Sequence, residues 1–139
     1  MNGHIGWTGD QWQAFKDLPR DTALNMLNLV RVRDWADYGD DRRVSGLDAY
    51  RAYGRDSQTP FAKVGGRVLW RGAFETGLIA PADEHWDFCF IAFYPNAAAF
   101  IAMQFDPDYQ AAVLHRQAAV SDSRLIRLGE LALGENFAS

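Results

Sequence analysis

The sequence predicts an α+β fold in which helices cover one face of an antiparallel sheet. Residues 24–33 and 86–94 are apolar on both faces of an extended chain, which is typical of inner strands covered from two sides. Helix-start signals stand at Ser45, Asn96 and Asp106. With two further strands the order is strand, helix, strand, strand, helix pair, strand. This order is the split βαβ pattern of a ferredoxin-like sheet.

A short helix precedes the first strand. Thr8 is a suitable N-cap, and Pro19 stops the helix after Leu18. No internal repeat, linker or low-complexity stretch divides the chain. We therefore expect one ferredoxin-like domain over residues 1–139, in which residues 1–22 form an N-terminal extension that holds the short helix.

The connection between the first two strands predicts a longer helix. This helix starts near Gly46 behind the N-cap Ser45, and Pro60 predicts an interruption or a kink in it. The pair Gly65-Gly66 predicts the end of the helix, because glycine is the preferred residue just beyond a helix C-terminus.

The second strand is expected over residues 67–74, with Val68, Trp70 and Phe74 on one side. Gly72 lies between them, where a bulge or a close neighbour would fit. Residues 77–84 contain Gly, Pro and acidic side chains and predict the connection of a long hairpin.

Two consecutive helices and a final strand complete the pattern. Asn96 and Asp106 mark the starts of the helices, and a proline stands beside each of them. Residues 125–131 predict the last strand, and residues 134–139 predict a frayed tail.

The composition is that of a globular domain of ordinary size. Of the 139 residues, 48% are hydrophobic and 23% are charged. The net charge of -4 gives no broad attraction to phosphate backbones or anionic lipids, so we expect neither nucleic acid nor a membrane as a partner. The longest apolar run, residues 88–94, is too short to span a bilayer, and the N-terminus lacks the pattern of a signal peptide. We expect a cytoplasmic protein.

The metal-binding residue types are sparse. Cys89 is the one cysteine, so neither an internal disulfide nor a zinc cluster can be built from cysteines. The three histidines show no spacing typical of a metal site. We expect no metal and no cofactor.

The two-sided apolar strands require a second layer on the sheet face that the helices leave uncovered. A second copy of the chain is the simplest source, because two sheets packed face to face would bury both apolar surfaces. The alternative is that the N-terminal helix, with Trp7, Trp12 and Phe15, folds back over this face. Because that helix is too short to cover the whole face, we expect a homodimer.

Several motifs resemble a known family. They are residues 26–33 (MLNLVRVR), Ser45-Gly46 with Tyr50, Gly65-Gly66, Trp86-Asp87, Tyr94-Pro95, residues 106–109 (DPDY), His115-Arg116 and residues 122–125 (DSRL). Nearly the whole chain resembles the family of the domain of unknown function 1330, in the dimeric α/β-barrel superfamily of ferredoxin-like proteins. The resemblance implies a βαββαβ subunit and a dimer whose two sheets form a barrel-like interface. Members of that superfamily include cofactor-independent monooxygenases, lactone isomerases and haem enzymes, so the resemblance implies no particular reaction.

Two histidines are candidates for acid–base chemistry. His115 lies off the apolar stripe of the last helix, at a flank that would face a cleft, and the alternative is a half-exposed helical histidine without a role. His85 lies beside Glu84 and Asp87 and would open onto the same pocket with a carboxylate to orient it. The alternative for His85 is an ordinary loop residue.

Polar side chains interrupt the first inner strand. Arg31 and Arg33 share one of its faces, and a buried guanidinium requires an anion. That anion would be a substrate carboxylate or an acid of this protein such as Asp87. Asn28 lies on the opposite face, and its amide needs partners in the backbone, in a second subunit or in a ligand.

Aromatic residues make up 14% of the chain, and several converge on the sheet and its facing helix. A flat apolar ligand would fit among them, although the same residues would also fill a core and a dimer interface. The candidate catalytic residues are His115, Arg31 and Tyr53, and the candidate ligand-binding residues are Asn28, Tyr50, Trp70, His85, Trp86 and Asp87.

Three functions are compatible with these residues. The first is a cofactor-independent enzyme of isomerase or monooxygenase type, in which His115, Arg31 and Tyr53 act on a small, flat, anionic or lactone-like molecule. The second is a non-catalytic dimer that binds a small apolar ligand as a sensor or carrier. The third is a structural dimer without a ligand, for which a solid interior would be expected.

Overall fold

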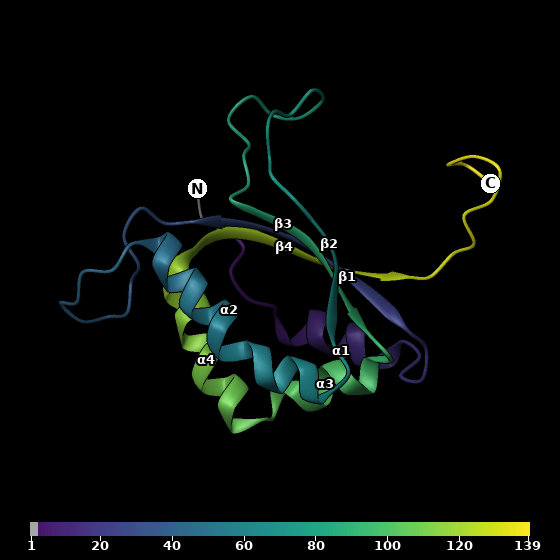
Figure 1. The fold of residues 1–139 in the computed structure, drawn as a ribbon, viewed down its shortest axis with the longest axis horizontal. Coiled ribbons are helices and arrows are strands. Elements are labelled where there is room, and N and C mark those ends of the chain that lie inside the picture. Colours follow the sequence, from purple (N-terminus) through teal and green to yellow (C-terminus); the bar gives the residue numbers. More distant parts are fainter. Residues whose placement is uncertain (1–2) are drawn as a thin grey trace.

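The structure is a computed structural model that describes residues 3–139. Figure 1 shows a sheet with helices packed on one side. In chain order the elements are α1 (Gly9–Asp17), β1 (Leu24–Val32), α2 (Gly46–Lys63), β2 (Arg67–Gly72), β3 (Phe88–Tyr94), α3 (Ala97–Gln104), α4 (Pro107–Ala119) and β4 (Val120–Gly129).

The four strands form one sheet in the order β2-β3-β1-β4. All of the pairings are antiparallel. The two stretches that the sequence predicts as inner strands, β1 and β3, do lie in the middle of the sheet. With α2 after β1 and the pair α3 and α4 after β3, this is the predicted α+β fold with ferredoxin-like topology.

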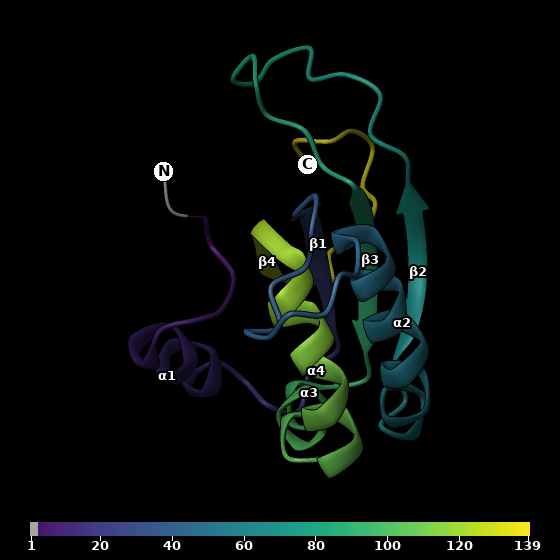
Figure 2. The same ribbon diagram turned by 90° about the vertical axis from the view of Figure 1, so that its left-hand side faces the viewer.

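The two faces of the sheet have different surroundings. Met26 pairs with Ala92 on the face that the helices cover, and both side chains are buried. Their neighbours Leu27 and Ile91 pair on the other face, which no helix covers (Figure 2). We call this the open face, and its apolar side chains are Leu27, Leu29, Trp70, Cys89, Ile91, Phe93, Ile126 and Leu128.

Helix α1 lies beside β4 on the helix-covered side of the sheet (Figure 2). Arg127 of β4 pairs with Met26, so it belongs to the helix-covered face, and it donates a hydrogen bond of 3.1 Å to the carbonyl oxygen of Phe15 in α1. The alternative in which the N-terminal helix folds back over the open face is therefore wrong. The open face stays apolar and uncovered within one chain.

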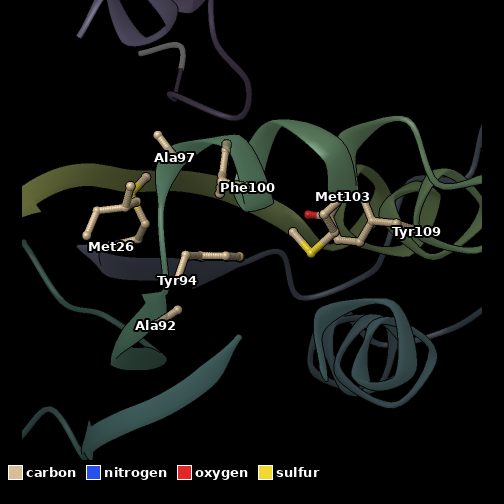
Figure 3. Packing of buried hydrophobic residues seen from close by; sticks show 8 residues of the cluster. Met26, Ala92, Tyr94, Ala97, Phe100, Met103 and Tyr109 are labelled. Carbon is tan, nitrogen blue, oxygen red and sulfur yellow. The ribbon is translucent and has the colours of Figure 1, made fainter. Parts of the chain in front are cut away.

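The buried side chains form two clusters on the helix-covered face. The first consists of Leu24, Met26, Ala92, Tyr94, Ala97, Phe100, Met103 and Tyr109 (Figure 3). The second consists of Val30, Ala49, Tyr50, Ala119 and Val120. Asn28 lies between the two clusters on β1, so a polar side chain interrupts the buried face where the clusters would otherwise meet.

The predicted helix caps are confirmed. The Oγ1 atom of Thr8 accepts a hydrogen bond of 3.1 Å from the backbone N–H of Gln11, whose side chain accepts one from the backbone N–H of Thr8 in return. The backbone N–H groups of Gly65 and Gly66 donate to the carbonyl oxygens of Ala62 and Phe61, and Gly65 has a φ of 84°. These bonds end α2 in the left-handed conformation that glycine adopts most readily.

The predicted interruption of α2 at Pro60 is wrong, because the helix runs continuously from Gly46 to Lys63. Proline removes one backbone donor, but Pro60 is only a few residues from the helix end. Helix α2 also packs along α4, and this packing outweighs the lost hydrogen bond.

The predictions for the outer strands need two corrections. Val68 and Trp70 do not share a face, because the register shifts between them and they pair with Ala92 and Ile91 respectively. A bulge of this kind inserts one residue and so reverses the alternation. Strand β4 begins at Val120 and not at Leu125, since it follows α4 without a loop.

Gly72 has the close neighbour that the sequence suggested. A Cβ atom at Gly72 would lie 2.4 Å from the ring of Trp70.

None of the helices within residues 3–139 combines the length and the apolar character needed to cross a membrane.

We predict that Gly46→Ala destabilises the fold and Gly54→Ala does not. A Cβ atom at Gly46 would lie 1.9 Å from the carbonyl oxygen of Arg33, so backbone must move, at a cost of about 1–3 kcal/mol. A Cβ atom at Gly54 meets no atom within 4 Å, and alanine should stabilise α2 by about 0.4–1 kcal/mol. Urea unfolding of both variants checks this, and equal stabilities would contradict the packing described at Gly46.

Candidate functional site

A cavity of about 1520 Å³ lies between the helix-covered face of the sheet and the helices. The sheet contributes Met26, Asn28, Phe88 and Phe90, helix α2 contributes Tyr50 and Tyr53, and helix α4 contributes Tyr109 and Arg116. Helix α1 and the residues before it form one side, with Trp7, Trp12 and Phe15 among them. The interior is therefore not solid, and Trp, Tyr and Phe side chains supply eleven of the residues that line it.

Asn28 brings an amide to the sheet side of the cavity. Its Nδ2 donates a hydrogen bond of 3.0 Å to the carbonyl oxygen of Met26, two residues earlier on the same strand. This bond fixes the orientation of the side chain and leaves the amide oxygen as an acceptor that faces the interior.

Three tyrosines from α2 and α4 surround the opposite side of the cavity. The hydroxyl groups of Tyr53 and Tyr109 are hydrogen-bonded to each other at 2.8 Å. The ring of Tyr50 packs on Phe88 with centroids 4.6 Å apart, and its hydroxyl group makes no hydrogen bond within residues 3–139. Burial raises the pKa of all three phenols above the usual value near 10, so they are neutral hydrogen-bond donors at physiological pH.

Arg116 brings a positive charge close to these phenols. Its charge partly offsets the effect of burial, which raises the pKa of the phenols of Tyr50, Tyr53 and Tyr109, and all four side chains line the cavity. The guanidinium donates to the carbonyl oxygen of Ile5 and, at 3.2 Å, to the Oγ atom of Ser123. Since a guanidinium has five N–H donors, it keeps donors for a further acceptor.

The charges that line the cavity are all positive apart from the titratable histidine His4. No aspartate or glutamate within residues 3–139 lines the cavity. Six arginines do, namely Arg51, Arg55, Arg71, Arg116, Arg124 and Arg127. Arg51 and Arg124 are paired with Asp48 and Asp122, whereas the other four have no carboxylate partner within the described part of the chain. The whole chain has 18 acidic and 14 basic residues, so the cavity is a cationic region of an acidic protein.

His115 of α4 does not line the cavity. Its Nδ1 atom is 2.6 Å from the hydroxyl oxygen of Tyr38, and its Nε2 atom is 3.3 Å from a carboxylate oxygen of Asp56 in α2. His115 therefore joins α2, α4 and the loop after β1. Of the three candidate catalytic residues, the cavity contains Tyr53 alone, because Arg31 belongs to the opposite side of β1, where it is paired in register with Asp122.

The candidate ligand-binding residues divide between several places. Asn28 and Tyr50 line the cavity. Trp70 lies on the open face with 58% of its surface exposed, and His85 is exposed in the connection between β2 and β3. Figure 1 shows that this connection extends beyond the sheet.

Trp86 and Asp87 have structural contacts just before β3. Trp86 is buried, and the guanidinium of Arg124 lies over its ring at 5.5 Å. The carboxylate of Asp87 accepts a hydrogen bond of 2.8 Å from the backbone N–H of Val32. It therefore fastens the start of β3 to the end of β1, and no salt bridge joins it to Arg31 or Arg33 in the described residues.

Within residues 3–139, no group of three or more His, Cys, Asp or Glu side chains lies close enough together to hold a metal ion. The chemistry that the cavity offers is hydrogen bonding from neutral phenols, an amide acceptor and positive charge.

Residues 41–128 match the family described as Domain of unknown function (DUF1330). This chain belongs to the DUF1330 family. A comparison with curated proteins gave no match.

Two crystal structures of one other protein are similar to this DUF1330 chain. The methylated RPA0582 protein is 52% identical, with 97% of this chain and 100% of that chain covered and a TM-score of 0.94. The RPA0582 protein of unknown function from Rhodopseudomonas palustris is 51% identical, with 94% and 99% covered and a TM-score of 0.90. A dimeric protein of unknown function with a ferredoxin-like fold from Bacteroides fragilis is 16% identical, with 78% and 96% covered and a TM-score of 0.49.

The DUF1330 chain places Tyr109 and Arg116 in the cavity, although the sequence-based candidates did not include them. Both residues belong to one stripe of α4 with Ala112 and Val113, at the spacing of one helix face. An arginine at the end of an otherwise apolar stripe was the signal that would have found Arg116.

We predict that the stability of this DUF1330 chain falls above about pH 10. Burial, the largest cause, raises the pKa of the Tyr50, Tyr53 and Tyr109 phenols above 10, and the same holds for Tyr94. The unfolded chain loses these protons near pH 10 while the folded chain keeps them. The stabilisation is therefore complete below pH 10 and is lost as the pH rises, by about 1.4 kcal/mol per pH unit for each protected phenol.

Urea unfolding between about pH 9 and 11, together with phenolate absorbance, measures this effect. Tyr50→Phe is the control, because it removes one buried phenol whose hydroxyl group bonds to no residue in 3–139 and should reduce the slope. Phenols that ionise near pH 10 in a chain that stays folded would contradict the burial of these tyrosines.

Proposed function

We propose that this DUF1330 chain binds a small, flat, anionic molecule in the cavity between its sheet and its helices. The observation that carries the proposal is the wall itself, in which aromatic rings and six arginines meet without any aspartate or glutamate from residues 3–139. A concave space lined by aromatic side chains and a few convergent polar groups is typical of small-molecule sites.

The arginines favour an anion over a neutral ligand. Arg55 and Arg71 are exposed and have no carboxylate partner within the described residues, so they would attract an anion toward the opening. Arg116 is half-buried and lines the cavity together with Tyr53 and Tyr109, and a guanidinium there can hold a carboxylate or an enolate through paired hydrogen bonds.

The aromatic lining favours a flat ligand. Phe88 and Phe90 on the sheet and Tyr50 and Tyr53 on α2 line the cavity, and a planar ring system can pack against such aromatic side chains. The amide oxygen of Asn28 and the phenols of Tyr53 and Tyr109 would orient polar substituents of the ligand.

A cofactor-independent reaction in this cavity is the second candidate function. The hydrogen-bonded pair Tyr53 and Tyr109 favours it, because two neutral phenols beside the Arg116 guanidinium would stabilise negative charge on a carbonyl or enolate oxygen. In such a reaction His115 would act as a positioning residue through Asp56 and α4, since its ring does not line the cavity. Reactions of the isomerase and monooxygenase types predicted from the sequence would both develop negative charge on an oxygen atom of the substrate.

The open face supports a homodimer. Leu27, Ile91 and Trp70 lie in register across three strands of this face, and nothing within residues 3–139 covers them. Contiguous apolar surface of this kind is typical of interfaces, and a second copy presents a face of the same shape and character. In this arrangement Arg31 would lie at the border of the interface beside Asp122.

We predict that naphthoate binds more tightly than naphthamide, which has the same shape and no charge. Arg116→Gln should remove most of this preference, about tenfold in Kd, because one charge-assisted hydrogen bond contributes about 1.5–3 kcal/mol. Chemical-shift mapping and titration calorimetry measure both ligands. Arg43→Gln is the matched control, because Arg43 packs on the ring of Trp35 and does not line the cavity.

Equal affinities of naphthoate and naphthamide for the unchanged protein would contradict the anionic ligand. Binding of both ligands at the open face, seen as shifts at Leu27 and Ile91 alone, would contradict the cavity as the site.

We predict that Ile91→Lys converts a dimer into a folded monomer. Ile91 pairs with Leu27 and Trp70 at the centre of the open face, so a lysine there would bring charge into a sheet-to-sheet interface. Light scattering should give about 15.6 kDa for the variant and twice that mass for the unchanged chain. Leu114→Lys on the exposed side of α4 is the control and should stay dimeric, and a monomeric unchanged chain would overturn the interface.

A further inference from the structure

Residues 3–23, which we call the N-terminal arm, form one wall of the cavity. Nine residues of the arm between His4 and Leu18 line it, and Trp7, Trp12 and Phe15 supply most of the apolar surface. Figure 2 shows α1 set apart from α2 and α4, beside the edge of the sheet at β4. Without the arm, this side of the cavity would be open to water.

The beginning of the arm is fastened by three hydrogen bonds. The backbone N–H of His4 donates to Asp122 at 2.8 Å, and the carbonyl oxygen of His4 accepts from the Oγ atom of Ser123 at 2.7 Å. The carbonyl oxygen of Ile5 accepts from the guanidinium of Arg116. All three partners belong to β4 or α4, so the arm is held across the end of the cavity.

The end of the arm is fastened separately. Arg127 donates to the carbonyl oxygens of Phe15 and Pro19, and its guanidinium lies over the ring of Phe15 at 4.8 Å. Between the two fastenings, Trp7 stacks on Trp12 and Trp12 stacks on Phe15, and all three rings lean on Phe100 of α3.

The arm packs on the two core clusters through partly buried side chains, among them Ile5, Trp12 and Phe15. None of the residues of α1 is buried, and Trp12 and Phe15 are only half-buried. An element with exposed backbone and little buried apolar surface opens at a lower free energy than the core does. On this basis the arm would detach at a lower free energy than the sheet and α2 to α4 would unfold.

Arg116 connects the arm with the ligand site. One guanidinium bonds the arm at Ile5, bonds Ser123 and lines the cavity together with the three tyrosines. The arm carbonyl and the serine hold this guanidinium in one orientation, and its remaining N–H donors are left for an anion. A closed arm thus prepares Arg116 for the ligand before the ligand binds.

We propose that the N-terminal arm is a moving wall of the ligand site, which closes over a planar anion and is coupled to that anion through Arg116. This proposal rests on the function proposed above. Because the anion binds best when the arm is closed, thermodynamic linkage requires that the bound anion keeps the arm closed. The ligand site then includes the aromatic side chains of the arm, which would pack against a flat ligand. They are Trp7, Trp12 and Phe15.

The first experiment tests the arm without any ligand. Hydrogen exchange of the full chain, measured by mass spectrometry, should show the amides of α1 exchanging at least tenfold faster than those of β1. Ser123→Ala should speed the exchange of the arm a further fivefold or so, because it removes the hydroxyl group between Arg116 and His4. Ser121→Ala is the matched control, since that hydroxyl group bonds to Arg31 and not to the arm.

The second experiment adds naphthoate as the probe. At ten times its Kd, naphthoate should slow exchange in α1 about tenfold and leave β1 unchanged, as expected for a ligand that binds only the closed form. Ser123→Ala should weaken naphthoate binding and should keep the preference for naphthoate over naphthamide, because the guanidinium is still present.

The outcomes separate the two proposals. Exchange in α1 as slow as in β1, or an effect of Ser121→Ala equal to that of Ser123→Ala, overturns the moving wall even if naphthoate binds. Naphthoate that binds in the cavity without slowing α1 also overturns it. If naphthoate does not bind, the proposed function fails, whereas fast arm exchange that responds to Ser123→Ala still supports a detachable arm.

Discussion

The spacing between the sheet and the helices depends on bulky aromatic rings packed at both ends of β1. At one end Phe100 and Tyr94 pack edge to face, and at the other end Tyr50 packs on Phe88. Interiors are close-packed, so these two contacts hold α3 and α2 at a fixed distance from the sheet. Asn28 lies on β1 between these two aromatic contacts and lines the cavity. The cavity is thus a consequence of how the core is filled.

Charge is distributed according to the same architecture. The arginines of β4, α2 and α4 reach the edge of the space between the layers, whereas Asp48 and Asp122 each neutralise one arginine from outside the cavity. An acidic protein thereby keeps a local positive potential in a region of reduced solvent access, where an electrostatic interaction is stronger than in water. The proposed anion, its orientation by Arg116 and the closing of the arm all depend on this separation of charge.

The sheet has two apolar faces, and each is used differently. Helices and the N-terminal arm enclose a cavity on one face, and the other face holds Leu27, Ile91 and further apolar side chains at the surface. Because α1 packs at the edge of β4 on the cavity side, it is not available to cover the open face. The arm and the proposed second subunit therefore complete the domain on opposite sides, and neither competes with the other.

The sequence determined the fold and its boundaries well, because these depend on local signals. These signals act within a few residues of one another and can be recognised in chain order. They are the runs of β1 and β3 that are apolar on both faces, the caps at Thr8, Ser45 and Asn96, and the glycine pair after α2. The break at Pro60 and the start of β4 were misjudged. There, packing on a distant helix and pairing with a distant strand outweighed local preference.

The sequence determined much less of the site. It pointed to Asn28, Tyr50 and Tyr53, which lie on the faces that periodicity predicts to be buried. Only the tertiary structure decided that Arg116 lines the cavity while its neighbour His115 contacts Tyr38 and Asp56. Adjacent residues on a helix point about 100° apart, so the position of the neighbouring elements decides which of them meets the cavity. That information lies in contacts between segments far apart in the chain.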